Sequence, residues 1–130
     1  VGEDVRPQYF VYWMLHRLGP EQLAADSPLA SVRILAARGP DRRSALLINY
    51  WPNETADRVV AVHWADLPSG RKELVTYRID DRQRWDAEAL EMIPLERRQI
   101  DTLGPYECHV YLPAGAVALV ELIDAAEGRP

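Results

Sequence analysis

At 130 residues and 14.8 kDa, the chain has the size of one ordinary domain, large enough to bury a hydrophobic core without disulfides or metals. Apolar residues make up 48% of it, while the net charge of −5 and the absence of a basic stripe argue against a nucleic-acid-binding protein. No apolar stretch reaches membrane-spanning length, and the single cysteine, Cys108, excludes an intramolecular disulfide framework.

The first expected element is a helix over residues 8–18. Pro7 suits a first helical turn, and the pair Gly19-Pro20 is a strong stop signal. The helix is apolar nearly all round: Phe10, Trp13, Met14 and Arg17 lie on one side, and Val11, Leu15 and Leu18 on another. A helix with two apolar faces needs two neighbours, and the rest of the chain supplies only one kind, so one neighbour is expected to be missing from this chain.

From residue 21 onward the hydrophobic period changes from helical to two. The expected strands, separated by turns rich in Gly and Pro, are residues 31–38, 43–51, 57–67, 71–80, 106–112 and 116–124. Many short strands at such close spacing indicate antiparallel pairing. The sequence therefore predicts a mainly β fold over residues 21–130, an antiparallel β-sandwich of about seven to nine strands.

The connection over residues 81–105 lacks the alternation of its neighbours. Its segment from Trp85 to Met92 predicts a short helix, which Pro94 ends. A connection this long within a sandwich is usually either functional or a packing flap.

Candidate catalytic and metal-binding residues form no recognisable arrangement. The acidic residues between Asp80 and Glu91 are not spaced as a facing carboxyl pair, and turn or solubility roles suit them better. The three histidines fall in no metal-binding pattern, and no glycine-rich phosphate loop is present. Cys108 and His109 are adjacent on an expected strand, which directs their side chains to opposite faces. We expect no catalytic residue, no metal and no cofactor in this chain.

The aromatic residues are the candidates for ligand binding. Tyr50, Trp51 and Trp85 could present flat rings that stack on sugars, or they could fill the core and the space under loops. The alternation in "LLINYW" places Asn49 and Trp51 on the same face as Leu47, so Asn49 needs hydrogen-bond partners if that face is buried. The exposure of Trp51 and its distance from Trp85 decide between a binding platform and a scaffold.

Four stretches, in this order, resemble one known family. "YFVYWMLHRLG" is similar to the last barrel helix of a retaining glycoside hydrolase, and "SALLINYW" to a strand carrying a "vLvwNY" string. "VTYRID" is similar to the family's Tyr-Arg-Ile-Asp strand end, and "LPAGAVALVELI" to its closing strand. Together they resemble the C-terminal β-sandwich of family 39 glycoside hydrolases, the β-xylosidase and α-L-iduronidase group, from about residue 8 to residue 123.

This resemblance implies a non-catalytic accessory domain. In the family both catalytic glutamates lie on a (β/α)8 barrel upstream of the sandwich, and no position of this chain corresponds to them. Residues 1–20 would be the remnant of the last barrel helix, buried between barrel and sandwich. The expected partner is that barrel. Two further expectations are an oligo- or polysaccharide bound as by a carbohydrate-binding module, and self-association through the N-terminal helix or through an open sheet edge.

The cellular compartment stays open. The N-terminal stretch "VGEDVRPQ" has neither the layout of a signal peptide nor an initiator methionine, as expected of an excised piece or a processed product. One cysteine does not distinguish an oxidising from a reducing environment.

Overall fold

The computed structural model describes residues 7–28, 31–50, 56–65, 67–80, 85–86 and 91–125, and it describes the backbone alone at 7–10, 85–86 and 91. One helix precedes ten strands within these ranges. The elements are α1 (Pro7–Arg17), β1 (Glu21–Leu23), β2 (Val32–Arg38), β3 (Arg42–Asn49), β4 (Arg58–Trp64), β5 (Gly70–Ile79), β6 (Trp85–Asp86), β7 (Glu91–Met92), β8 (Glu96–Thr102), β9 (Tyr106–Leu112) and β10 (Val117–Asp124).

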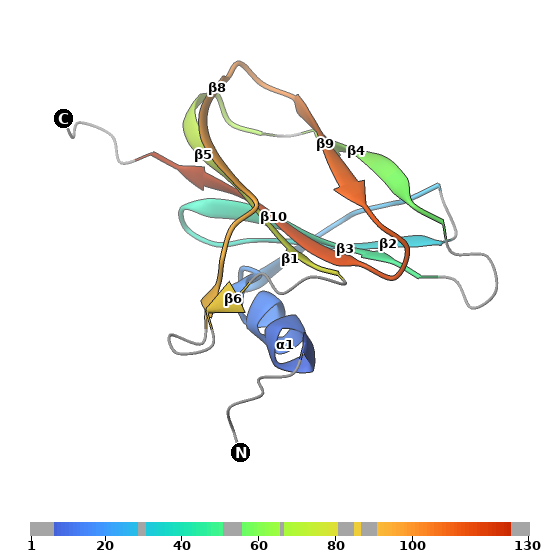
Figure 1. Ribbon diagram of the computed structural model, residues 1–130. Coiled ribbons are helices and arrows are strands. Elements are labelled where there is room, and N and C mark those ends of the chain that lie inside the picture. The colour runs from blue at the N-terminus through green and yellow to red at the C-terminus, as the bar shows by residue number, and fades with distance from the viewer. Residues whose placement is uncertain are drawn as a thin grey trace.

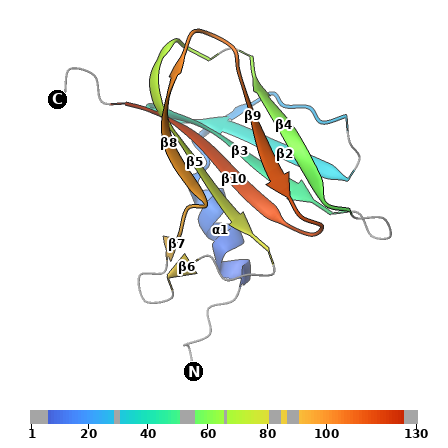
Figure 2. The ribbon, with the colours of Figure 1, turned by 45° about the horizontal axis from the view of Figure 1, so that its top comes forward.

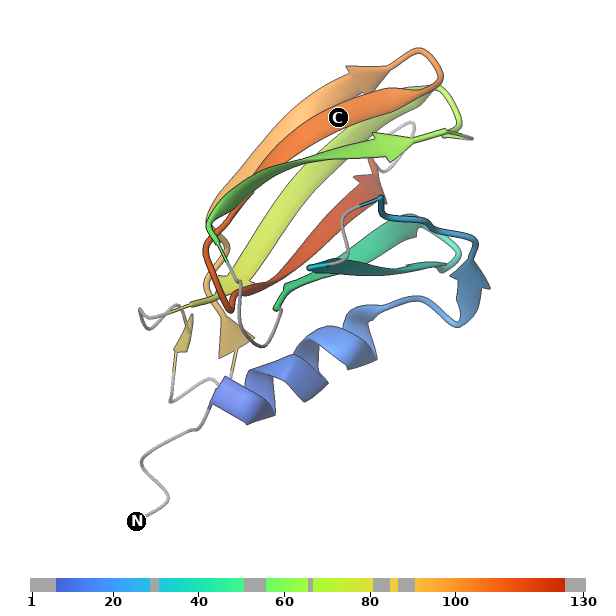
Figure 3. The same ribbon diagram turned by 90° about the vertical axis from the view of Figure 1, so that its right-hand side faces the viewer.

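The strands form an antiparallel β-sandwich, as the alternation predicts. Six strands make the large sheet in the order β1-β2-β3-β10-β5-β8, and β4 and β9 make a small sheet that faces it. Figure 1 and the tilted view in Figure 2 show the small sheet over one face of the large one. Helix α1 lies along the opposite face (Figure 3). The large sheet is therefore the middle layer of three.

The expected short helix between Trp85 and Met92 is wrong. Residues 85–86 and 91–92 pair instead as the antiparallel strands β6 and β7. Residues 96–102, expected to be irregular, form β8 and pair with β5 over seven residues. The free edge of β5 offers a full row of backbone hydrogen bonds, and this tertiary pairing overrides a weak local pattern.

The inner core lies between the two sheets. Every second residue of the large sheet faces it, and β4 and β9 supply the opposite wall. Its fully or nearly fully buried members include Ala45, Leu47, Leu74, Ala118, Val120 and Leu122 from the large sheet, and Val62, Trp64, Cys108, Val110 and Leu112 from the small one. The remaining residues of β3, β5 and β10 point to the other face.

The outer core lies under α1. Met14 is fully buried there against a patch of Leu46, Val75 and Leu119, which come from three neighbouring strands. The Trp13 ring meets the Tyr77 ring edge to face, with centroids 5.0 Å apart and planes at 76°. These contacts orient the helix on the sheet.

The end of α1 depends on a close backbone approach. The helix stops at Arg17, and Gly19 passes directly over the carbonyl group of Arg38 at the end of β2. A Cβ atom at Gly19 would lie 2.1 Å from the Arg38 carbonyl carbon, so only glycine fits. The Gly19-Pro20 stop signal thus also places β1 against β2.

Candidate functional site

Of the three candidate stacking residues, only Tyr50 has a side chain that the structure describes. Tyr50 follows β3 directly, and 59% of its side chain is exposed. Trp51 lies outside the described residues. Trp85 belongs to β6 and pairs with Met92 through the backbone, but its side chain is outside the described part. A shared platform of Trp51, Trp85 and Tyr50 therefore stays a prediction.

Asn49 is a buried structural residue. Its amide nitrogen Nδ2 donates to the carbonyl oxygens of Ala56 at 2.8 Å, Leu112 at 2.9 Å and Pro113 at 3.2 Å. Its backbone N–H donates to Ala116, and its carbonyl accepts from Gly115. These bonds fasten the end of β3 to the β9–β10 turn and give the Asn49 amide nitrogen the partners that the sequence pattern requires, whereas the buried Oδ1 atom has no hydrogen-bond partner among the described residues.

A polar cluster that the sequence pattern misses lies beside this turn. The Asp57 carboxylate accepts from the Tyr111 hydroxyl at 3.0 Å and from the backbone N–H of Ala114 at 2.9 Å. These two bonds, the backbone one first, hold the pKa of Asp57 below its usual range. Arg78 lies over the Tyr111 ring, 5.4 Å from its centroid, and bonds Asp80 at 2.7 Å. No spacing rule joins residues 57, 78 and 111, so only the fold reveals the cluster.

The titratable groups of the small sheet do not form a catalytic arrangement. Cys108 is buried in the inner core, and burial raises the pKa of its thiol, which keeps it protonated and unreactive. His109 points to the opposite, exposed face, as the alternation predicts, and lies 3.1 Å from Glu107, which also contacts His63. Among the described residues, no group of three His, Cys, Asp or Glu side chains gathers where it could hold a metal ion.

Glu121 is a buried carboxylate in the outer core. Arg17 of α1 reaches it through two bonds of 3.0 and 3.1 Å, and Arg42 of β3 adds a third of 3.2 Å. The Arg17 guanidinium also lies over the rings of Trp13 and Tyr77 at 4.8 and 5.5 Å. Because two guanidinium groups, one from α1 and one from β3, bind this buried carboxylate, it holds the helix on the sheet.

The outward side of α1 carries the exposed residues Tyr12, Leu15 and His16. Tyr12 is 66% exposed and Leu15 is 39% exposed, although Met14 between them is fully buried. Of the second apolar face expected from the sequence, only Leu15 is exposed, because Val11 and Leu18 pack against the outer core. No described element lies beyond the outward side of the helix in Figure 3.

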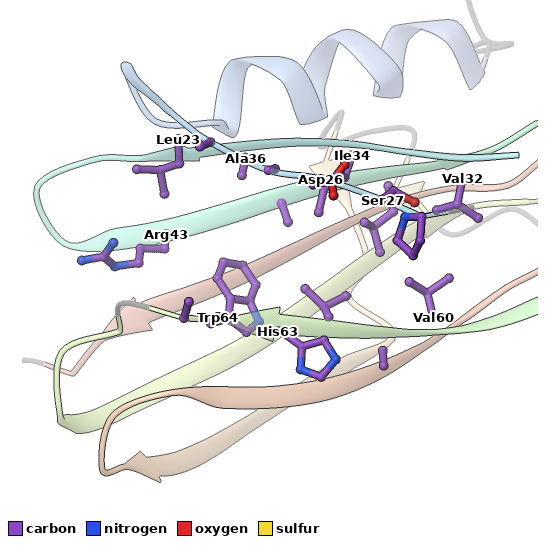
Figure 4. Close-up of a pocket in the computed structure, with 18 of the residues that line it drawn as sticks. Leu23, Asp26, Ser27, Val32, Ile34, Ala36, Arg43, Val60, His63 and Trp64 are labelled. Carbon is purple, nitrogen blue, oxygen red and sulfur yellow. The ribbon is translucent and has the colours of Figure 1, made fainter. Parts of the chain in front are cut away.

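A cleft of about 700 Å³ opens between the sheets on the side of β4. One wall is β4, with Val60 and Trp64 turned inward, and the floor is β2 and β3 (Figure 4). The segment of residues 24–28, between β1 and β2, forms the other rim, where Asp26 and Ser27 lie. The lining is mostly aliphatic, so the cleft is suited to apolar groups rather than to charged ones.

Three solved structures show the same fold within larger proteins. A GH39 enzyme from Xanthomonas axonopodis pv. citri matches with TM-score 0.73 and 18% identity, over 92% of this chain and 30% of that one. A monomeric β-xylosidase from Caulobacter crescentus CB15 matches with TM-score 0.72 and 20% identity, over 93% and 31%. A GH30 endoxylanase from Clostridium papyrosolvens C71 matches with TM-score 0.59 and 17% identity, over 90% and 27%.

These matches confirm the resemblance at the level of the fold: the chain has the β-sandwich found in family 39 enzymes. It spans less than a third of the length of the three solved proteins. The sequence matches no protein-family model and no curated protein. No helix in the described part of the chain has the length and apolar character needed to cross a lipid bilayer.

Proposed function

We propose that this chain is a non-catalytic accessory β-sandwich domain of a glycoside hydrolase. It packs against a (β/α)8 catalytic barrel, supplied by polypeptide outside these 130 residues, and stabilises that barrel. One observation carries the proposal: the match to two solved glycoside hydrolases covers over 90% of this chain but about 30% of each of those proteins. The described residues contain no facing acid–base carboxyl pair in support of a reaction of their own.

The outward side of α1 is the surface proposed to meet the barrel. Its inner side is already buried on the sheet through Met14, so Tyr12 and Leu15 are left for a second neighbour. Residues 1–20 then act as the link between the two domains, and residues 21–130 as the sandwich. The two hydrogen bonds between Arg17 and Glu121 would fix the position of the helix relative to the large sheet.

Substitution on this surface tests the proposal. In the full product of the gene, Leu15→Glu should lower stability by about 2 kcal/mol, because a buried leucine at a domain interface is replaced by a charge. In the isolated 130-residue chain the same change should have little effect. The measurement is calorimetric unfolding of both proteins.

Leu103→Glu is the matched control, since Leu103 is 95% exposed in the turn between β8 and β9. An equal effect of Leu15→Glu and Leu103→Glu in the full product would contradict the proposal. So would a gene that encodes these 130 residues and nothing more.

The second candidate is a carbohydrate-binding module with Tyr50, Trp51 and Trp85 as stacking rings. The exposed ring of Tyr50 is the observation in its favour. Titration with xylo-oligosaccharides and acidic polysaccharides, followed by tryptophan fluorescence, distinguishes the two functions. Saturable binding that Tyr50→Ala weakens at least about tenfold would favour the module.

A further inference from the structure

A second, smaller pocket of about 260 Å³ lies at the end of the sandwich where β2 turns into β3. Its walls are this turn, residues 67–68 after β4, and the end of β10. Among the described residues that line it, three are arginines, Arg38, Arg42 and Arg43, and one is a carboxylate, Asp124. An excess of cations around a concave surface is the arrangement that attracts an anion.

Two of these charged groups already have partners that neutralise them. Asp124 accepts a bond of 2.6 Å from Lys72, whose side chain is 4% exposed. Arg42 donates to the buried Glu121 at 3.2 Å, on the outer face of the large sheet. The charge that the pocket presents therefore comes from the remaining two arginines.

Arg38 and Arg43 lie directly opposite each other in the antiparallel pair of β2 and β3. Arg43 is two residues before Ala45, which faces the inner core, so both arginines belong to the inner face of the large sheet. Figure 4 shows the Arg43 side chain at the opposite end of the apolar cleft from Val32. The Cβ atoms of directly opposite residues are about 4.5–5.5 Å apart, and two like charges there destabilise the strand pair. The pairing thus brings two guanidinium groups within reach of one ligand.

The described part of the chain supplies these two arginines with one anion between them. Glu21 of β1 accepts a bond of 2.7 Å from Arg38, in a pair that is exposed to water. Arg43 makes no hydrogen bond and no ion pair with any described residue, and it is only partly buried. The cross-strand pair therefore carries one more positive than negative charge.

We propose that this pocket binds one small organic anion between Arg38 and Arg43, with a carboxylate or phosphate group on a body the size of a single sugar ring. The planar fork of a guanidinium group binds either of these groups through two parallel hydrogen bonds. A volume of about 260 Å³ is close to the lower limit of small-molecule pockets, about 300 Å³, so the ligand is small. Pro40 and Pro68 give the walls apolar surface for the CH groups of a ring. The chain's net charge of −5 disfavours a long polyanion in its place.

Isothermal titration calorimetry on the full gene product at low salt tests the site. D-glucuronate and glucose phosphorylated at its primary hydroxyl distinguish the two sources of the anion, and uncharged glucose is the reference ligand. At least one of the two anions should bind saturably, and Arg43→Gln should weaken that binding at least about tenfold, because it removes charge-assisted hydrogen bonds. Arg33→Gln is the matched control, since Arg33 is exposed on the other face of β2, and it should leave binding unchanged.

Each other outcome counts against the anion site. No saturable binding of either anion, or binding that Arg43→Gln leaves unchanged, overturns it, and so does equal weakening by Arg33→Gln or equal binding of uncharged glucose. Without ligand, Arg43→Gln should unfold at the wild-type temperature or above it, because it reduces the like-charge repulsion with Arg38. A clear loss of stability would show that Arg43 has a structural role instead. The site lies within this chain, so its failure leaves the proposed function to be judged by Leu15→Glu alone.

Discussion

The two faces of the large sheet are closed in different ways. The outer face is covered by α1 through aromatic contacts, a buried methionine and a neutralised carboxylate, all within one compact cluster. The inner face is covered by two strands, which seal it near β9 and leave a cleft near β2. Helix α1 with its charged anchor covers the central strands β3, β10 and β5 and leaves Leu35 of β2 42% exposed, whereas the two strands of the small sheet leave an open cleft over β2.

The largest expected effect concerns the anchor of the outer face. Glu121→Ala should destabilise the isolated chain by about 3 kcal/mol, because it removes a buried carboxylate and leaves Arg17 and Arg42 close together without their anion. Urea unfolding followed by circular dichroism measures the loss. Glu21→Ala is the control, since its pair with Arg38 is exposed and should contribute nothing measurable. A fully stable Glu121→Ala variant would show that apolar contacts alone hold α1.

The next effect compares two alanines on the inner face. Ala118→Leu should cost about 1–3 kcal/mol, because Ala118 is fully buried where the sheets meet and extra atoms overpack the core. Ala36→Leu should change stability by no more than about 0.5 kcal/mol, because its side chain enters the open cleft. Thermal unfolding of both variants is the measurement. Equal costs would mean that the cleft closes in solution.

The smallest expected effect concerns the end of the small sheet, where Asp57 is bonded to Tyr111 and Ala114. A folded-state pKa below the unfolded value means that Asp57 contributes stability above its unfolded pKa and loses it as the pH falls below about 4. Asp57→Asn should therefore lower the urea midpoint near pH 7 and have less effect near pH 3. A difference between the two proteins that is the same at both pH values would contradict this.

The sequence predicts the sandwich because strand alternation is a local signal. The expected strand at 106–112 matches β9 residue for residue, and the helix at 8–18 lies within one residue of α1. The same signal fails for β8, where consecutive charged residues hide the period, and between Trp85 and Met92, where cross-strand pairing replaces the expected helix. Whether an edge segment forms a strand depends on pairing with the neighbouring strand and not on the pattern of its own side chains.

The sequence by itself determined the fold class, the N-terminal helix and the need of Asn49 for partners, since each follows from spacing along the chain. Only the tertiary structure decided that Asn49 binds three carbonyl groups, that Glu121 meets Arg17 across 104 residues, and that β4 borders an open cleft. Such contacts join positions far apart in sequence. They depend on the order of the strands in the sheet, and no local hydrophobic period contains that order.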